Sequence, residues 1–571
     1  MAFQISPGVN VSEVDLTTVV PSILTTAGAF AGFFKWGPVN KRVQVDNEIT
    51  LVNAFGSPET NSATPFFTAA SFLSYGNNLQ VVRAVGANCL NAVSNTAVEY
   101  FQIQNEDVFQ ASLLNTTSGG AYGPFAGRYP GVLGNSITVS VIDAGASFAS
   151  WTVNGVGVSS YFTGAPGTSQ QAESAGASND EIHIIVTDSG GLFTGVKNTV
   201  LEVYPYLSKA SDATDSLGNS NYYKQVIFNN SNYIYAVDPV NFANTSSTWG
   251  SAMVGGTNYA TSNTAQTVTL VKGQDQVPAT ANTVTAYSLF QNPDEVDISL
   301  VLTGDAGLAV QQYVIDNIAG SRKDCIAFVS PPSANVINQV NSEVTNILSW
   351  RNALNRSSSY AVADCGWKYS FDKYNNVYRY VPLNGDIAGL CVNTDNVRDP
   401  WFSPAGFNRG NLKNVVKLAW NPTKTQRDSL YAVGINPVGT FPGNGTVLYG
   451  DKTLQTKPSA FDRINVRRLF IILEKTIAQA AQYSLFEFND EFTRANFVSL
   501  VTPFLRDIQG RRGIYDFRVV CDTTNNTPQV IDSNQFVGDI YIKPARSINF
   551  IQLNFVAVRT GVDFTEVVGK F

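Results

Sequence analysis

Few side chains in this sequence could carry out acid–base, metal or nucleophilic chemistry. The chain has one histidine, His183, within the segment DEIHIIVTD. A Ser-His-Asp or Cys-His arrangement, or a histidine-based metal site, would depend on that residue. Because Ile182, Ile184 and Val186 recur at every second position, we expect a strand with His183 on its solvent-facing side. His183 is therefore interpreted as structural rather than catalytic.

The cysteines form no metal-ligand or disulfide pattern. No two of them have the C-x-x-C spacing, and none lies near the histidine in sequence. Free cysteine is among the most buried residue types, so we expect structural thiols in a reducing cytoplasm. The sequence predicts no metal site and no cofactor. The five residues are Cys89, Cys325, Cys365, Cys391 and Cys521.

Other catalytic signatures are also missing from the sequence. It contains no phosphate-binding G-x-x-x-x-G-K-[ST] loop, no G-x-S-x-G and no H-E-x-x-H. Adjacent acids such as Glu106 and Asp107 indicate catalysis only when two carboxylates face each other across a cleft. We therefore expect a protein that is not an enzyme.

The composition indicates a large protein with extensive contacts to other chains. A chain of 571 residues is long enough for about three to five domains. Charged residues make up 14% of it, against about 25% in an ordinary soluble protein. No apolar run approaches the ~20 residues of a membrane span, and residues 1–30 lack a signal-peptide pattern. We expect a soluble, unexported protein without direct membrane insertion.

Residues 91–285 have a different character from the rest of the chain. They are rich in Ser, Thr, Gly and Asn, and short strand-like runs at Ser136–Asp143 and Thr264–Val271 predict one or two β-rich outer insertion domains. Five basic and thirteen acidic residues give this segment a net charge of −8, which disfavours nucleic acid as a partner. The tyrosine-rich stretch Asn219–Val237 leaves open a carbohydrate-binding or adhesive β protein, although ordinary strand packing is the simpler interpretation.

Helices and strands alternate on both sides of this insertion. The alternation is typical of an α/β layer, so residues 22–90 and 286–450 are expected to form one middle α/β core interrupted by the insertion. The expected strands are Ala27–Phe34, Leu79–Val85, Cys325–Pro331 and Tyr360–Trp367, and the expected helices are Thr64–Tyr75, Gly307–Gly320 and Asn335–Leu354.

Residues 451–560 predict an inner C-terminal α/β domain that begins with an amphipathic helix. Its apolar positions are Val466, Leu469, Phe470, Leu473, Ile477, Ala480, Ala481 and Leu485. Asp462 is a candidate cap. Arg463, Arg467, Arg468 and Lys475 lie largely elsewhere on the helical wheel. They form either a solvated face or a basic patch for acidic surfaces of partner subunits.

The rest of this domain is expected to contain a second helical segment and three strands. Pro503 lies inside the segment Asp490–Ile508, which favours two short helices. Strands follow at Gly513–Asp522 and Ile540–Pro544. The run Ser547–Thr560 has apolar residues on both faces, so we expect it to be a central strand. It carries Ile551, Leu553, Phe555 and Val556, the candidate receiving sheet for arms from other copies.

Both ends of the chain are expected to be extended, half-apolar arms without a local hairpin partner. The N-terminal arm, residues 1–21, contains SPGVNVSEVDL with Val9, Val11, Val14 and Leu16, and the C-terminal arm, residues 561–571, carries Val562, Phe564 and Val568. The burial free energy of such side chains is smaller than the entropic cost of ordering the arm, so hydrogen bonds to an open sheet edge are also needed. Strand addition to another copy supplies them. Such a contact is heterologous and propagates into rings or helices.

Several long segments of the sequence are distinctive: SPGVNVSEVD, WFSPAGFNRG, LYGDKT, FDRINVRRLF, GIYDFRVVCDTTNNTP and IYIKPARSINFIQLNFVA. These segments resemble one known family, the contractile tail sheath proteins of myoviruses, T-even-like in detail. The similarity is dense over residues 400–571, good over 1–90 and thin over 91–285. The fold class expected for such a chain is multidomain α+β and α/β.

The resemblance implies a structural subunit that forms stacked hexameric rings around a tail tube and contracts to drive the tube through the host cell envelope. It also implies a homo-oligomer, with the tail tube protein and the baseplate and tail terminator proteins as partners. The protein would be part of the virion after assembly in the host cytoplasm. The same fold would serve the sheath of a bacterial phage-tail-like injection device, which stays open as an alternative.

Overall fold

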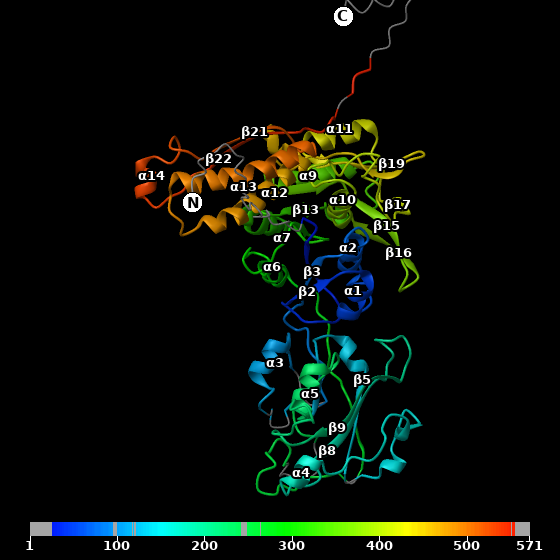
Figure 1. Cartoon of the computed structure of the whole chain (residues 1–571). Helices are drawn as coiled ribbons and strands as arrows, with labels where there is room; N and C mark the ends of the chain where they lie inside the picture. The colour runs from blue at the N-terminus through cyan, green and yellow to red at the C-terminus, as the bar shows by residue number, and fades with distance from the viewer. Residues whose placement is uncertain are drawn as a thin grey trace, which may run out of the picture.

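A seven-stranded sheet forms the middle of the molecule in the computed structural model, which describes residues 25–94, 100–116, 118, 121–144, 146–240, 248–262, 264–549 and 551–553 (Figure 1). Its strand order is β18-β14-β13-β12-β1-β3-β2, and every neighbouring pair is parallel except β2 with β3. The strands are β1 (Gly28–Gly32), β2 (Arg42–Val45), β3 (Leu79–Arg83), β12 (Leu300–Leu302), β13 (Ile326–Val329), β14 (Ala361–Asp364) and β18 (Ile435–Asn436).

Strand β1 joins the parts of the sheet that come from either side of the long insertion. Gly28 pairs with Leu79 on one side and with Leu300 on the other. These strands are nearly all buried and rich in small and branched apolar residues, as expected for a parallel sheet covered on both faces. The predicted strands at 27–34, 79–85, 325–331 and 360–367 are confirmed.

Helices cover this sheet, and two of them pack unusually closely. A Cβ atom at Gly385 of α10 would lie 2.5 Å from the carbonyl oxygen of Thr68 in α2, so only glycine permits this approach. The predicted helix at 64–75 is confirmed. The predicted helix at 307–320 is also found, with a π-helical segment at Val314–Ala319, whereas the one at 335–354 begins only at Glu343. The helices are α1 (Glu48–Phe55), α2 (Ala63–Leu73), α6 (Thr280–Ser288), α7 (Leu308–Tyr313), α8 (Gly320–Arg322), α9 (Glu343–Leu354), α10 (Asn384–Val397) and α11 (Lys424–Ala432).

Two small antiparallel sheets extend from this middle part. One has the order β16-β15-β17 and the other is the hairpin β19-β20. Their strands are β15 (Trp367–Asp372), β16 (Val377–Pro382), β17 (Lys417–Leu418), β19 (Val438–Phe441) and β20 (Gly445–Leu448).

Residues between β3 and α6 build a separate, mostly antiparallel part at the lower end of the molecule in Figure 1, far from α12 and α13. Its four-stranded sheet has the order β11-β5-β8-β9. The predicted strands at 136–143 and 264–271 are confirmed. The elements are α3 (Glu106–Ser112), β4 (Phe125–Gly127), β5 (Ile137–Asp143), β6 (Thr152–Val153), β7 (Val156–Gly157), α4 (Gln170–Ser174), β8 (Glu181–Asp188), β9 (Thr199–Ser208), α5 (Tyr223–Asn230), β10 (Ile234–Ala236) and β11 (Gln266–Thr269).

His183 lies on β8 as predicted, but it is buried and not solvent-facing. Its Nε2 lies 2.9 Å from the carbonyl oxygen of Gly164, and its Nδ1 accepts the backbone N–H of Tyr206 at 3.0 Å. The pairing of β8 with β9 is irregular here, and this irregularity frees the Tyr206 N–H for the ring. Both ring nitrogens are thus satisfied by backbone groups in a neutral imidazole.

The remaining candidates for chemistry also have structural roles. All five cysteines are buried and free, as predicted. Glu106 pairs with Lys41 at 3.2 Å and with Arg128 at 3.6 Å, while Asp107 pairs with Lys41 at 3.3 Å. Over the described ranges, no group of three or more His, Cys, Asp or Glu residues is arranged to hold a metal ion, and no helix is long and apolar enough to cross a membrane.

The tyrosine-rich stretch 219–237 does not form strands throughout. It contains helix α5 and the short strand β10. Tyr223 and Tyr235 are fully buried in the core, and Tyr222 and Tyr233 are half-buried. This stretch therefore contributes packing.

The C-terminal part contains two long helices and a two-stranded sheet. Helix α13 is a single helix through Pro503, so the expected division into two helices is wrong. Its buried residues Phe497, Val501, Leu505 and Ile508 form a continuous apolar stripe across the proline, and this packing holds both halves in one line. Helix α12 starts with Arg463 as its N-cap, not Asp462. The elements are α12 (Ile464–Ala481), α13 (Glu491–Gly510), β21 (Ile514–Val520), α14 (Pro528–Asp532) and β22 (Asp539–Pro544).

The described part of the run 547–560 differs from the expected central strand. Residues 547–549 and 551–553 belong to no strand, and Ile551 and Leu553 are 77% and 71% exposed. A strand needs a neighbour to bond its backbone. After β22 the chain instead turns to Asp451, which accepts the Ser547 hydroxyl at 2.8 Å.

Candidate assembly site at the two ends of the described chain

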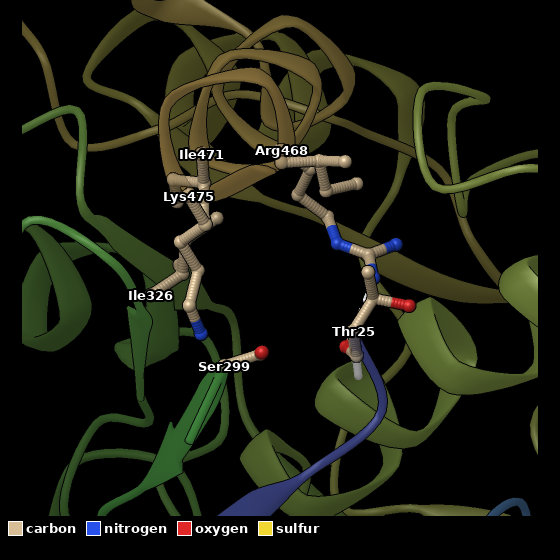
Figure 2. A pocket seen from close by; sticks show the side chains of 7 residues that line it. Thr25, Ser299, Ile326, Arg468, Ile471 and Lys475 are labelled. Atoms are coloured by element: carbon tan, nitrogen blue, oxygen red, sulfur yellow. Dashed lines mark hydrogen bonds between the residues drawn. The ribbon is translucent and has the colours of Figure 1, made fainter. Parts of the chain in front are cut away.

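Helix α12 holds the first described residues of the chain through Arg468. The guanidinium donates two hydrogen bonds to Asp395 of α10, at 2.7 and 2.6 Å, and both side chains are nearly buried. Thr25 completes the cluster: its hydroxyl donates to Asp395 at 2.7 Å, and its carbonyl oxygen accepts from Arg468 Nη2 at 3.5 Å. Figure 2 shows Arg468 reaching from α12 towards Thr25. Thr25, the first described residue and four positions beyond the predicted N-terminal arm, is therefore tied to both α10 and α12.

The electrostatics of this cluster favour a permanent ion pair. Burial alone would lower the pKa of the Arg468 guanidinium, but the adjacent carboxylate of Asp395 more than offsets this, and the pKa is raised. A two-point guanidinium–carboxylate pair also fixes the orientation of both side chains. Removal of one partner would leave the other charge buried and unpaired.

Lys475 lies two turns further along α12 and connects it to the central sheet region. Its ammonium group forms an ion pair with Asp297 and lies 3.9 Å from Asp324. The gap between Arg468, Lys475 and Ser299 encloses only about 10 Å³, room for about one water molecule (Figure 2). These residues form a packed contact between α12 and the middle sheet, and the gap is too small to be a ligand site.

Arg467 is buried between two aromatic rings. Its guanidinium carbon lies 4.2 Å from the ring centroid of Tyr360 and 4.0 Å from that of Phe461, and Nη1 donates to the Tyr360 hydroxyl at 3.0 Å. Burial lowers the pKa of this guanidinium. The two cation–π contacts take the place of a carboxylate partner.

The first turn of α12 holds the other end of the described chain through Asp451. Arg463 Nη1 lies 3.4 Å from this buried carboxylate, which also accepts the hydroxyls of Ser403 at 3.0 Å and Ser547 at 2.8 Å. Asn549 approaches it at 3.5 Å. The segment that leads towards the predicted C-terminal arm is thereby attached to the same helix as Thr25.

The predicted basic face is therefore corrected. Arg463, Arg467, Arg468 and Lys475 form neither a solvated face nor a free patch for partner subunits, because each is used within the chain by Asp451, Tyr360 and Phe461, Asp395 or Asp297. Their partners Asp395, Asp451 and Thr25 carry no signal in the sequence and were missed.

Strands β21 and β22 form a sheet with unused edges. Within the described part of the chain each strand has the other as its only strand neighbour. One face packs on α12 and α13 through Phe517, Val519, Ile540 and Ile542, whereas Tyr515 and Tyr541 are exposed. A two-stranded sheet whose outer edges have no strand neighbour in the described part of the chain is a template for further strands.

The arm residues predicted to provide those strands, and two of the residues predicted to receive them, lie outside the described ranges. They are Val9, Val11, Val14 and Leu16 of the N-terminal arm, Val562, Phe564 and Val568 of the C-terminal arm, and Phe555 and Val556 of the receiving sheet.

Comparisons with known proteins give phage tail sheath proteins along almost the whole chain. Residues 303–454 match the model of the phage tail sheath protein central domain, and residues 456–557 match that of the phage tail sheath C-terminal domain. The tail sheath protein of Vibrio phage KVP40 is 36% identical over 99% of this chain and 100% of its own length. That of Enterobacteria phage T4 is 35% identical over 99% of each.

A solved structure shows the same fold. The sheath tail protein of Listeria innocua superimposes with a TM-score of 0.53 at 11% identity, covering 92% of this chain and 96% of that protein. On the whole-chain identity to curated tail sheath proteins, the chain belongs to the tail sheath protein family of phages with contractile tails.

Proposed function

We propose that this protein polymerises as stacked hexameric rings around a tail tube, and that contraction of this sheath drives the tube through the host cell envelope. Its role is structural rather than enzymatic, and its place is the virion, after assembly in the host cytoplasm. Membership of the tail sheath family supports the sheath, and a homo-oligomer follows from that role. The tail tube, baseplate and tail terminator proteins complete the set of partners.

The observation that carries the assembly mechanism is the open sheet β21–β22. Its apolar face is already seated on α12 and α13, so added strands would extend a fixed platform. Strand addition joins backbone groups and needs little side-chain matching, which suits a contact repeated by every subunit. We assign the N-terminal arm and the C-terminal arm of neighbouring copies to the two free edges, with residues 551–556 as part of the receiving region.

The described residues that lead towards the two arms support a tethering role. Thr25 is held by Arg468 and Asp395, and Ser547 by Asp451, so tension on either arm is transmitted to α12. Rigid bodies joined by such tethers can rotate and slide past one another without losing their connections. This arrangement suits a sheath that shortens while remaining continuous.

Two alternatives are less well supported. The sheath of a bacterial phage-tail-like injection device would use the same fold, but identities of 35–36% over whole phage proteins favour the phage tail. A carbohydrate-binding role would need accessible aromatic side chains in 219–237, and Tyr223 and Tyr235 are buried.

Removal of an arm tests this proposal. Deleting Met1–Leu16, or Val562–Phe571, should leave the subunit folded, with an unchanged thermal midpoint, and abolish tubes in negative-stain microscopy. A finer variant replaces Val9, Val11, Val14 and Leu16 by serine, and its matched control replaces the intervening Asn10, Glu13 and Asp15 by serine. Normal tubes from the truncated chains would contradict the tethering role, and absence of tubes from the intact chain would contradict the sheath itself.

A further inference from the structure

The loop between α12 and α13 exposes an unusual number of large apolar side chains. Phe486 is fully exposed, Phe488 is 84% exposed and Tyr483 is 78% exposed, and Leu485 and Phe492 are also exposed. Large apolar side chains exposed close together in sequence indicate an interaction site. We call residues 482–492, the loop together with the first two residues of α13, the aromatic loop.

The structure holds this loop in a defined shape. Asn489 donates to the carbonyl oxygen of Gln535 at 2.7 Å and accepts from Arg494 at 2.8 Å. Asp490 caps α13 by accepting the N–H of Thr493 at 2.8 Å. Phe486 has a φ of 69°, a left-handed conformation that a bulky residue rarely adopts. The aromatic side chains are therefore presented by a loop whose conformation is fixed by hydrogen bonds.

The charge of the aromatic loop is entirely negative. Glu487, Asp490 and Glu491 are exposed and lie among the aromatic residues, and the loop has no basic residue. A partner should therefore offer positive charge next to apolar or planar groups.

The opposite end of α13 offers this chemistry. The N–H of Ala545 donates to the carbonyl oxygen of Gly513 at 3.0 Å, and Arg512 and Arg546 are the residues next to this hydrogen bond at the end of the β21–β22 pair. Both are exposed, and no ion pair is found for either within the described residues. Positive charges gathered at one end of the sheet favour the approach of an anionic group. We call Arg512 and Arg546 the arginine end; the neighbouring Arg511 is already paired with Asp399 and Asp507.

The two surfaces lie at opposite ends of one helix. Helix α13 has twenty residues, so they are separated by about 30 Å. Within one copy the aromatic loop cannot reach the arginine end across this distance. When two copies are arranged head to tail, the loop of one copy can reach the arginine end of the next. Phenylalanine, tyrosine and arginine are also the residues most enriched at protein interfaces, where a guanidinium can stack on a ring.

We propose that the aromatic loop of one subunit binds the arginine end of the next copy of this chain. This inference rests on the proposed sheath assembly and adds to it a second intersubunit contact besides the arms. The contact is heterologous and continues around a ring. The arginine end includes Arg546, directly before Ser547, where the chain leads towards the C-terminal arm.

Charge reversal tests the contact in the full-length chain. One variant carries Glu487→Arg and Glu491→Arg, and a second carries Arg512→Glu and Arg546→Glu. Each should raise the concentration required for tube formation by about tenfold or more, as followed by sedimentation and negative-stain microscopy. The chain with all four substitutions, and an equimolar mixture of the two variants, should assemble again because every contact regains opposite charges. Glu173→Arg, at an exposed site on α4, is the matched control and should assemble normally.

The outcomes separate this inference from the proposed function. If the intact chain forms tubes and the reversed variants form them equally well, the contact between loop and arginine end does not exist. The proposed function as a sheath subunit would be unaffected by that result. If loop reversal leaves tubes intact and only weakens binding of purified tail tube protein, the partner is the tube, and the inference is overturned. Failure of the four-substitution chain to recover, with an unchanged thermal midpoint, would also overturn it.

Discussion

Arg468 and Asp395 form a buried two-point ion pair, at 2.6 and 2.7 Å, that joins α12 to α10 and holds Thr25 at the same place. The pair thus connects the C-terminal part, the middle sheet and the beginning of the described chain. Because its side chains are almost fully buried, its strength depends little on salt, unlike that of a surface pair.

Breaking this pair from one side should destabilise the protein strongly. Asp395→Ala leaves an unpaired buried guanidinium, and we expect the free energy of unfolding to fall by about 3–5 kcal/mol. The double variant Asp395→Leu with Arg468→Met removes both charges and should lose less. Urea unfolding of the full chain measures both. Asp516→Ala, which breaks the exposed Lys543–Asp516 pair, is the matched control, with an expected loss of at most about 1 kcal/mol. Equal effects of Asp395→Ala and Asp516→Ala would contradict the role of the buried pair.

Stability should decrease in mild acid because of His183. Burial lowers the pKa of its imidazole below the usual value of 6.5, because the charged ring would lose its hydration in the interior. The unfolded state therefore binds a proton more readily than the folded state. The contribution is fully present above pH 6.5 and is lost as the pH falls through the folded-state pKa.

The measurement is the thermal midpoint of the full chain and of His183→Gln at several values between pH 5 and 7.5. The decrease on acidification should be smaller in His183→Gln, because glutamine does not titrate, and the difference between the two profiles isolates this group from the carboxylates. Parallel profiles would show that His183 is not protected from protonation.

Replacement of Pro503 by alanine should stabilise the protein. Pro503 is exposed in the interior of α13, has no N–H to donate and is unfavourable in a helix by up to about 3 kcal/mol relative to alanine. Calorimetry of Pro503→Ala should show a higher midpoint. Thr502→Ala, at the neighbouring position, should stay within about 0.5 kcal/mol. A lower midpoint for Pro503→Ala would mean that the local bend at the proline is needed for packing.

The amino-acid sequence by itself determined the local elements and the family. Periodic apolar residues specify α12, the alternation in 136–143 specifies β5, and long matching segments identify the sheath family without any knowledge of contacts. These features depend on residues close to one another in the chain, and their spacing is visible in the sequence.

Partners that are distant in sequence were decided only by the tertiary structure. Nothing in the pattern of residues 390–399 indicates that Asp395 meets Arg468 and Thr25, or that His183 is enclosed by backbone from Gly164 and Tyr206. Helical spacing fixes the side of a helix on which a residue lies, but not what covers that side. The same applies to residues 547–549 and 551–553, whose apolar pattern indicates a strand but which belong to no strand in the described part of the chain, because a strand is completed by the chain beside it.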